Sequence, residues 1–179
     1  MRVHVESLLA CDAETAWKLV KTSAVLIDVS RPLVDIRPLP GESFPEIWRQ
    51  GATVGARCYL FGFIPQGRRE LFFERVDDAA REIQTREHDP LIRHWDHLLR
   101  VQSAGGGHCR YSDTVDIDAG WFTLLVWLFA LCFYHHRHRR WRRLIRKLQK
   151  KRGDVYLRKK KKKFLKIFVT KYCFPIRRA

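Results

Sequence analysis

The chain has 179 residues, which fits one domain, and 46% of them are hydrophobic, so it can bury a substantial core. This composition excludes a wholly disordered chain, a collagen-like chain and an array of many repeats. The net charge of +16 is unevenly distributed. Residues 1–119 contain 15 basic and 18 acidic residues, residues 120–150 contain 8 basic and no acidic ones, and residues 151–179 contain 12 basic and 1 acidic. The basic character therefore belongs to the C-terminal third, which argues against nucleic acid as a partner of the main body.

The cysteines indicate a reducing compartment. There are five, widely spaced and without a C-x-x-C pair, so they predict neither a disulfide framework nor a zinc site. The start, MRVHVESLL, is too polar for a signal peptide, and we expect a cytoplasmic protein. No Walker loop, G-x-G-x-x-G, G-x-S-x-G or H-E-x-x-H motif occurs, and we expect no metal and no cofactor.

The first elements in chain order are a strand and two helices. Val3–Ser7 alternates apolar and polar residues, which predicts a half-buried strand. Asp12 is a candidate N-cap for a helix over 13–21, because its carboxylate can accept hydrogen bonds from the first turn. A second short helix is expected over Ser23–Val29, ended by Pro32.

The middle of the chain predicts a series of strands joined by turns. A loop over Glu42–Gly51 carries Trp48 as an anchored aromatic residue, and a turn is expected at Pro65–Gly67. Gly62 is interpreted as a bulge inside an aromatic-rich strand. The expected strands are Leu33–Arg37, Val54–Ile64, Leu71–Val76 and Arg81–Glu87.

A hairpin and a long helix complete the chain. Ile92–Gln102 and His108–Asp118 flank the glycine-rich turn Ser-Ala-Gly-Gly-Gly. Everything after Gly120 predicts one helix with an apolar stripe at alternating spacings of 4 and 3, on residues Trp127, Leu131, Tyr134, His138, Trp141, Ile145 and Leu148. Meandering strands between terminal helices predict an α+β fold, with a curved antiparallel sheet of six or seven strands around the C-terminal helix.

This order resembles the SRPBCC superfamily, which includes START, birch-pollen-allergen-like and polyketide cyclase/dehydrase-like proteins. The likeness rests on the segments VHVESLLACDAETAWKLV, LFGFIP, IRHWDHLLRV, CRYSDTVDIDAG and FYHHRHRRWRRL, between about residues 2 and 148. It implies the helix-grip fold, with an apolar cavity between the sheet and the last helix. It implies no single activity, because the superfamily includes carriers, sensors and enzymes.

The predicted hairpin brings His97 and Asp113 together. If the turn centres on Gly105, these two residues face each other on the apolar face of the sheet, because strand side chains alternate with period two. One interpretation is a polar anchor for a ligand, or a general base oriented by a carboxylate. The other is a buried pair that stabilises the strand register.

We expect a carrier or sensor that binds a hydrophobic small molecule or lipid in the cavity. The alternative is a cyclase- or dehydratase-type enzyme acting on a polyketide-like or aromatic substrate, with His97 as acid/base beside Asp113. The expected ligand-binding residues come from the sheet and from the last helix: Tyr59, Phe61, Phe63, Trp95, His97, Leu99, Tyr111, Asp113, Trp127, Leu131 and Tyr134.

Two features point to membranes. The uncharged segment 119–134 is followed by a basic run, which leaves open a membrane-attached protein or contact of the basic helix end with an anionic membrane surface.

The helix-grip domain is expected over residues 1–150. Residues 151–179 are expected to form a basic tail that is disordered or non-native, or that binds anionic lipid or nucleic acid by charge.

Overall fold

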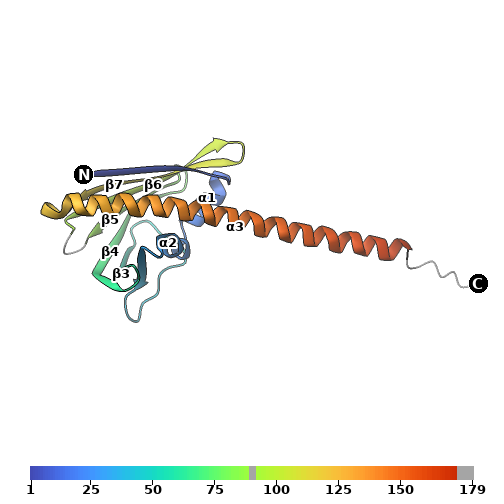
Figure 1. The fold of residues 1–179 in the computed structure, drawn as a ribbon, viewed down its shortest axis with the longest axis horizontal. Helices are drawn as coiled ribbons and strands as arrows, with labels where there is room; N and C mark the ends of the chain where they lie inside the picture. The colour runs from blue at the N-terminus through green and yellow to red at the C-terminus, as the bar shows by residue number, and fades with distance from the viewer. Residues whose placement is uncertain (89–91, 173–179) are drawn as a thin grey trace, which may run out of the picture. The chain divides into compact units, whose positions relative to one another are not determined.

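A computed structural model describes residues 1–88 and 92–172, and the chain divides into two units, residues 1–142 and residues 143–179. The first unit holds an antiparallel sheet of 7 strands in the order β1-β7-β6-β5-β4-β3-β2, two short helices and the start of α3 (Figure 1). The predicted α+β class and the long C-terminal helix are confirmed. The elements are β1 (Arg2–Leu9), α1 (Ala13–Val20), α2 (Ser23–Ser30), β2 (Val34–Pro38), β3 (Thr53–Leu60), β4 (Ile64–Asp77), β5 (Glu82–His88), β6 (His94–Gly105), β7 (His108–Asp118), η1 (Gly120–Phe122) and α3 (Thr123–Tyr172).

The second unit is the rest of α3 as far as Tyr172. Part of the predicted tail, residues 173–179, lies outside the described residues. In the described part of the chain, no helix has an apolar stretch long enough to cross a membrane.

The first helix begins where the sequence predicts. The Asp12 carboxylate accepts a hydrogen bond from the Thr15 backbone N–H at 2.7 Å and another from the Thr15 hydroxyl at 2.8 Å. These bonds satisfy donors that the first turn leaves free. The apolar face of α1 is buried, and Trp17 on that face donates through Nε1 to Asp78 at 2.7 Å. The loop before β3 is anchored as expected, because the Trp48 ring stacks on Phe73 at 4.6 Å.

The core lies between the sheet and the first part of α3. Residues on β1 alternate between buried and exposed, so that Val3, Val5 and Leu9 face the core. The same alternation on β6 and β7 buries every second side chain. The central cluster combines the inner faces of these strands with α3: Val3, Val5, Ile92, Trp95, Val115, Ile117, Ala119, Ala130, Phe133 and Tyr134.

The β6–β7 register differs from the predicted one. His97 lies opposite Val115, and Leu99 lies opposite Asp113, so the strands are shifted by two residues. The turn lies later than predicted, because β6 continues to Gly105, which pairs with His108. A shift of two preserves the face of every side chain, since the pleat has period two. His97 and Asp113 therefore still meet, as diagonal rather than direct neighbours.

The predicted strand Val54–Ile64 is wrong, because the chain reverses within it. Strand β3 ends at Leu60, which pairs with Ile64 at the start of β4. Gly62 (φ 83°) lies in this turn and adopts the left-handed backbone conformation that glycine favours. The expected turn at Pro65–Gly67 instead lies within β4, opposite a register shift between Cys58 and Tyr59. Aromatic residues favour strands, so the sequence of this segment predicted one continuous strand and not the reversal.

Helix α3 presents part of the predicted stripe to the sheet, since Tyr134, His138 and Trp141 are buried. Trp127 and Leu131 are only half-buried at the edge of the core, and the Trp127 indole donates to the Arg2 carbonyl at 2.8 Å. The buried face within the first unit consists of Ala130, Phe133, Tyr134, Arg137, His138 and Trp141. The buried face is therefore wider than the predicted stripe and includes Arg137, while Leu131 lies at its edge.

Candidate functional site

A cavity of about 380 Å³ lies between the sheet and α3. This volume is within the range of roughly 300–1,000 Å³ that is typical of small-molecule sites. Most of its lining is apolar and comes from α2, strands β2 to β4, Trp95 and α3. The lining residues are Leu26, Ser30, Val34, Ile36, Cys58, Leu60, Gln66, Arg69, Leu71, Glu87, Ile92, Trp95, Leu125, Val126, Phe129, Phe133, Tyr134 and Arg137.

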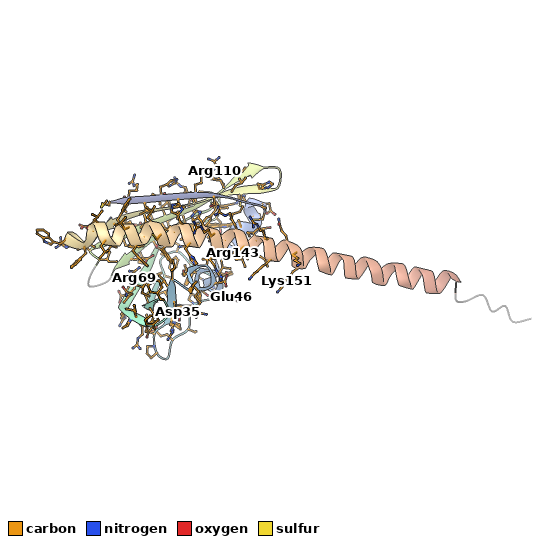
Figure 2. The ribbon with its side chains drawn as sticks, viewed as in Figure 1. Asp35, Glu46, Arg69, Arg110, Arg143 and Lys151 are labelled. Carbon is orange, nitrogen blue, oxygen red and sulfur yellow. The ribbon has the colours of Figure 1, made fainter. Side chains whose placement is uncertain are left out.

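Two of the polar groups in this lining form an ion pair. Arg69, which is labelled in Figure 2, comes from β4 and donates to Glu87 on β5 at 3.2 Å. The Arg69 guanidinium also lies over the Trp95 ring, 5.2 Å from its centroid. The Thr85 hydroxyl donates to the other carboxylate oxygen of Glu87 at 3.4 Å. This side of the cavity therefore holds compensated charges.

A second cavity of about 50 Å³ adjoins the first, because Leu26, Leu71, Glu87 and Arg137 line both. Its remaining lining is Val20, Val29, Trp48, Phe73, Ile83, Thr85, His97, Leu99 and Trp141.

Asp113 is the centre of a buried hydrogen-bond network. Its side chain is 0% exposed. Oδ1 lies 2.7 Å from Nε2 of His97 and accepts from the Tyr111 hydroxyl at 3.1 Å. Oδ2 lies 3.1 Å from Nε2 of His138 and 3.8 Å from Nε of Arg137. Strands β6 and β7 supply one side of this network, and α3 supplies the other.

The hydrogen-bond network determines which nitrogen atoms of His97 and His138 donate to Asp113. Burial by itself raises the pKa of Asp113, but the charge of Arg137 and the hydrogen bonds from the histidines outweigh burial and hold that pKa well below its usual value. An ionised carboxylate only accepts hydrogen bonds, so both histidines donate to it through Nε2. The Nδ1 of His138 lies 2.9 Å from the Ser7 hydroxyl oxygen. The neutral form of His97 carries its basic lone pair on Nδ1.

Six of the predicted site residues lie at the cavities or in the network. Trp95 and Tyr134 line the larger cavity, and His97 and Leu99 line the smaller one. Tyr111 and Asp113 are buried beside them.

The other five predicted residues line neither cavity: Tyr59, Phe61, Phe63, Trp127 and Leu131. Phe61 and Phe63 are 53% and 73% exposed at the β3–β4 turn. Tyr59 lies under the Arg37 guanidinium at 4.4 Å, while its strand neighbours Cys58 and Leu60 line the larger cavity.

Sequence reasoning missed the charged residues of the cavity: Arg69, Glu87 and Arg137. Arg137 is only 6% exposed, although it lies in the basic run for which the sequence leaves open contact with an anionic membrane surface. A helical signal for it was present, because it continues the row formed by Ala130, Phe133 and Trp141 at spacings of 3 and 4.

Apolar side chains are also exposed where α3 begins. Trp121 is 98% exposed, and its neighbours are exposed as well: Phe122, Leu124, Leu125 and Leu128. Leu125 lines the larger cavity, so this apolar patch reaches the cavity.

The fold occurs in proteins of several activities. A START superfamily protein from Mycobacterium smegmatis is 13% identical, with a TM-score of 0.61 over 82% of this chain and 98% of that chain. Norcoclaurine synthase from Thalictrum flavum, in complex with dopamine and hydroxybenzaldehyde, is 13% identical, with a TM-score of 0.60 over 82% and 87%. The Zhui aromatase/cyclase from a Streptomyces species is 12% identical, with a TM-score of 0.57 over 82% and 93%. These likenesses confirm the helix-grip fold implied by the resemblance to the SRPBCC superfamily.

Comparisons of sequence assign a family to the chain but no activity. No curated protein matches the chain. A family model described as a domain of unknown function, DUF8410, matches residues 7–145, which include the end of β1, all of β2 to β7, both short helices and the start of α3.

Proposed function

Since the chain belongs to the DUF8410 family, we propose a function from its own geometry: it binds a hydrophobic small molecule between the sheet and α3. The observation that carries this proposal is the cavity of about 380 Å³ with its largely apolar lining. Burial of apolar ligand surface there supplies affinity, and a few placed polar groups supply orientation. The structural neighbours support it at the level of the fold, since START and aromatase/cyclase proteins share this architecture.

The test uses a variant that fills the cavity. Val126 lines the cavity, whereas Leu128 lies two residues further along α3 and is exposed. We expect Val126→Trp to weaken binding of the neutral fluorescent probe 1-N-phenylnaphthylamine by about tenfold or more, which corresponds to ~1.4 kcal/mol. The matched control Leu128→Trp adds the same indole outside the cavity and is expected to leave affinity unchanged.

The same preparation identifies the natural ligand. Native mass spectrometry before and after organic extraction is expected to show a copurified apolar compound. The proposal is overturned if the folded wild-type protein binds no apolar probe, or if Val126→Trp binds the probe as well as wild type does.

A second candidate is a cyclase- or dehydratase-type enzyme. It is favoured by the bond of 2.7 Å between His97 Nε2 and Asp113, which leaves Nδ1 as the basic atom of a residue that lines the smaller cavity. For an enzyme, His97→Gln is expected to lower turnover by about 10² or more with little change in affinity. For a carrier, the same variant changes ligand affinity by no more than a few-fold and there is no turnover to lose.

The proposal includes a cytoplasmic location. In the described part of the chain, the residues Cys11, Cys58, Cys109 and Cys132 are thiols rather than disulfides, which agrees with a reducing compartment. Contact of the basic residues of α3 with an anionic membrane stays a prediction. Arg140 already pairs with Asp28 at 2.9 Å, so it has a partner within the protein.

A further inference from the structure

Arg137 is a buried cation with unmet hydrogen-bonding capacity. Its side chain is 7% exposed, and its Nε is buried without a hydrogen-bond partner. The ion pair that it forms among the described residues is with Asp113, at 3.8 Å, which is too long for a hydrogen bond. A guanidinium carries five N–H donors, and buried donors are almost always satisfied. Among the described residues, the Nε donor of Arg137 therefore lacks an acceptor.

The carboxylates nearby are already engaged. Asp113 accepts hydrogen bonds from His97, His138 and Tyr111, all at 3.1 Å or less. Glu87 accepts from Arg69 at 3.2 Å and from Thr85 at 3.4 Å. Neither group turns an oxygen to Arg137 at hydrogen-bond distance. By contrast, Arg69, which also lines the larger cavity, has a direct carboxylate partner in Glu87.

Arg137 lies where it would contact a ligand bound in the cavities. It lines both the larger and the smaller cavity, so it lies where the two adjoin. Tyr134, one helical turn earlier, places its ring 5.7 Å from the Arg137 guanidinium carbon and lines the larger cavity as well. The larger cavity, with its largely apolar lining, is therefore bordered by a guanidinium group that is shielded from water.

We propose that Arg137 binds the carboxylate of the ligand, so that the natural ligand is an amphipathic acid with its apolar body in the larger cavity. This inference rests on the proposed function. Guanidinium and carboxylate form two parallel hydrogen bonds, and such bonds are strongest where water is excluded. A carboxylate adds one negative charge to a region that holds two arginines and two acidic residues. A phosphate monoester adds nearly two, which makes its burial costlier.

The test compares dodecanoate with dodecanol, which share an apolar chain and differ in charge. Both are titrated at pH 8 by calorimetry into wild type and Arg137→Met. We expect wild type to prefer dodecanoate by at least about tenfold, because charge-assisted bonds are roughly twice as strong as neutral ones. In Arg137→Met the preference is expected to disappear, while dodecanol binding is kept. Arg139→Met removes an exposed arginine on the same helix and is expected to keep the preference.

A second variant guards against misfolding. Arg137→Lys keeps the charge opposite Asp113 but loses the planar fork, so it is expected to weaken the preference for dodecanoate without abolishing it. The inference is overturned if wild type binds the acid and the alcohol equally, or if Arg137→Met or Arg137→Lys retains the full preference. Binding of the neutral probe 1-N-phenylnaphthylamine separates the two proposals. If that probe binds while the preference is absent, only the acid inference fails, and if nothing binds, the proposed function fails with it.

Discussion

Replacing Asp113 by asparagine removes the charge at the centre of the buried network while preserving its shape. In the native protein this carboxylate accepts hydrogen bonds from His97, His138 and Tyr111, and its charge lies 3.8 Å from Arg137. The amide nitrogen of asparagine is a donor, so it faces the N–H of at least one histidine, which is a donor as well. Arg137 is left as a buried cation with no carboxylate in contact.

Both effects destabilise the folded state. Breaking a buried ion pair by removing one partner costs about 3–5 kcal/mol, so we expect the free energy of unfolding to fall by this amount. With a urea m value of about 2 kcal/mol/M, the midpoint of unfolding moves down by roughly 1.5–2.5 M. A loss of about 3–5 kcal/mol is a large part of the free energy of unfolding of a typical domain, which is about 5–15 kcal/mol.

The assay is urea unfolding followed by circular dichroism, with Asp116→Asn as the matched control. Asp116 lies on the same strand but on the outer face, where it pairs with Arg2 at 2.9 Å. Losing a surface pair of this kind costs about 0–1 kcal/mol. If Asp113→Asn is as stable as Asp116→Asn, the network does not stabilise the fold and the reasoning is refuted. Adding Arg137→Met to Asp113→Asn is expected to recover part of the loss, because no unpaired charge remains.

Three further results are expected. The pKa of Asp113 is lowered in the folded protein, so its contribution to stability is present above the unfolded pKa of about 3.9 and is lost as pH falls through the folded pKa. The difference in stability between wild type and Asp113→Asn should therefore begin to shrink below about pH 4 in acid titrations, and parallel curves contradict this. Phe63→Ser should leave affinity for 1-N-phenylnaphthylamine within about twofold in a fluorescence titration, because Phe63 is exposed outside the cavities, and a tenfold loss would place the binding site elsewhere. Asp12→Ala should lower the unfolding free energy by about 1 kcal/mol in the same urea assay through loss of the α1 N-cap, whereas an unchanged midpoint contradicts the role of the cap.

Local patterns in the sequence predicted most of the elements and some of the residues at the candidate site. Alternation along Val3–Ser7 and the capping chemistry of Asp12 predict structure from neighbouring residues alone, and both agree with the fold. The meeting of His97 and Asp113 survives the two-residue error in register, because the period of a strand keeps both side chains on one face. The larger cavity and the helix-grip arrangement were implied by the resemblance to a known superfamily.

Tertiary packing decided the remainder of the site. The turn at Phe61–Phe63 depends on where β4 pairs with β3, and local strand preference does not encode that partner. The packing of α3 on the sheet places Arg137 inside and leaves Trp127 and Leu131 at the edge of the core. Hydropathy alone assigns an arginine to solvent, because isolated burial of a charge is unfavourable. Only the assembled sheet and helix supply Asp113 as a counter-charge from a distant strand, and this makes a buried Arg137 stable at the inner end of the cavity.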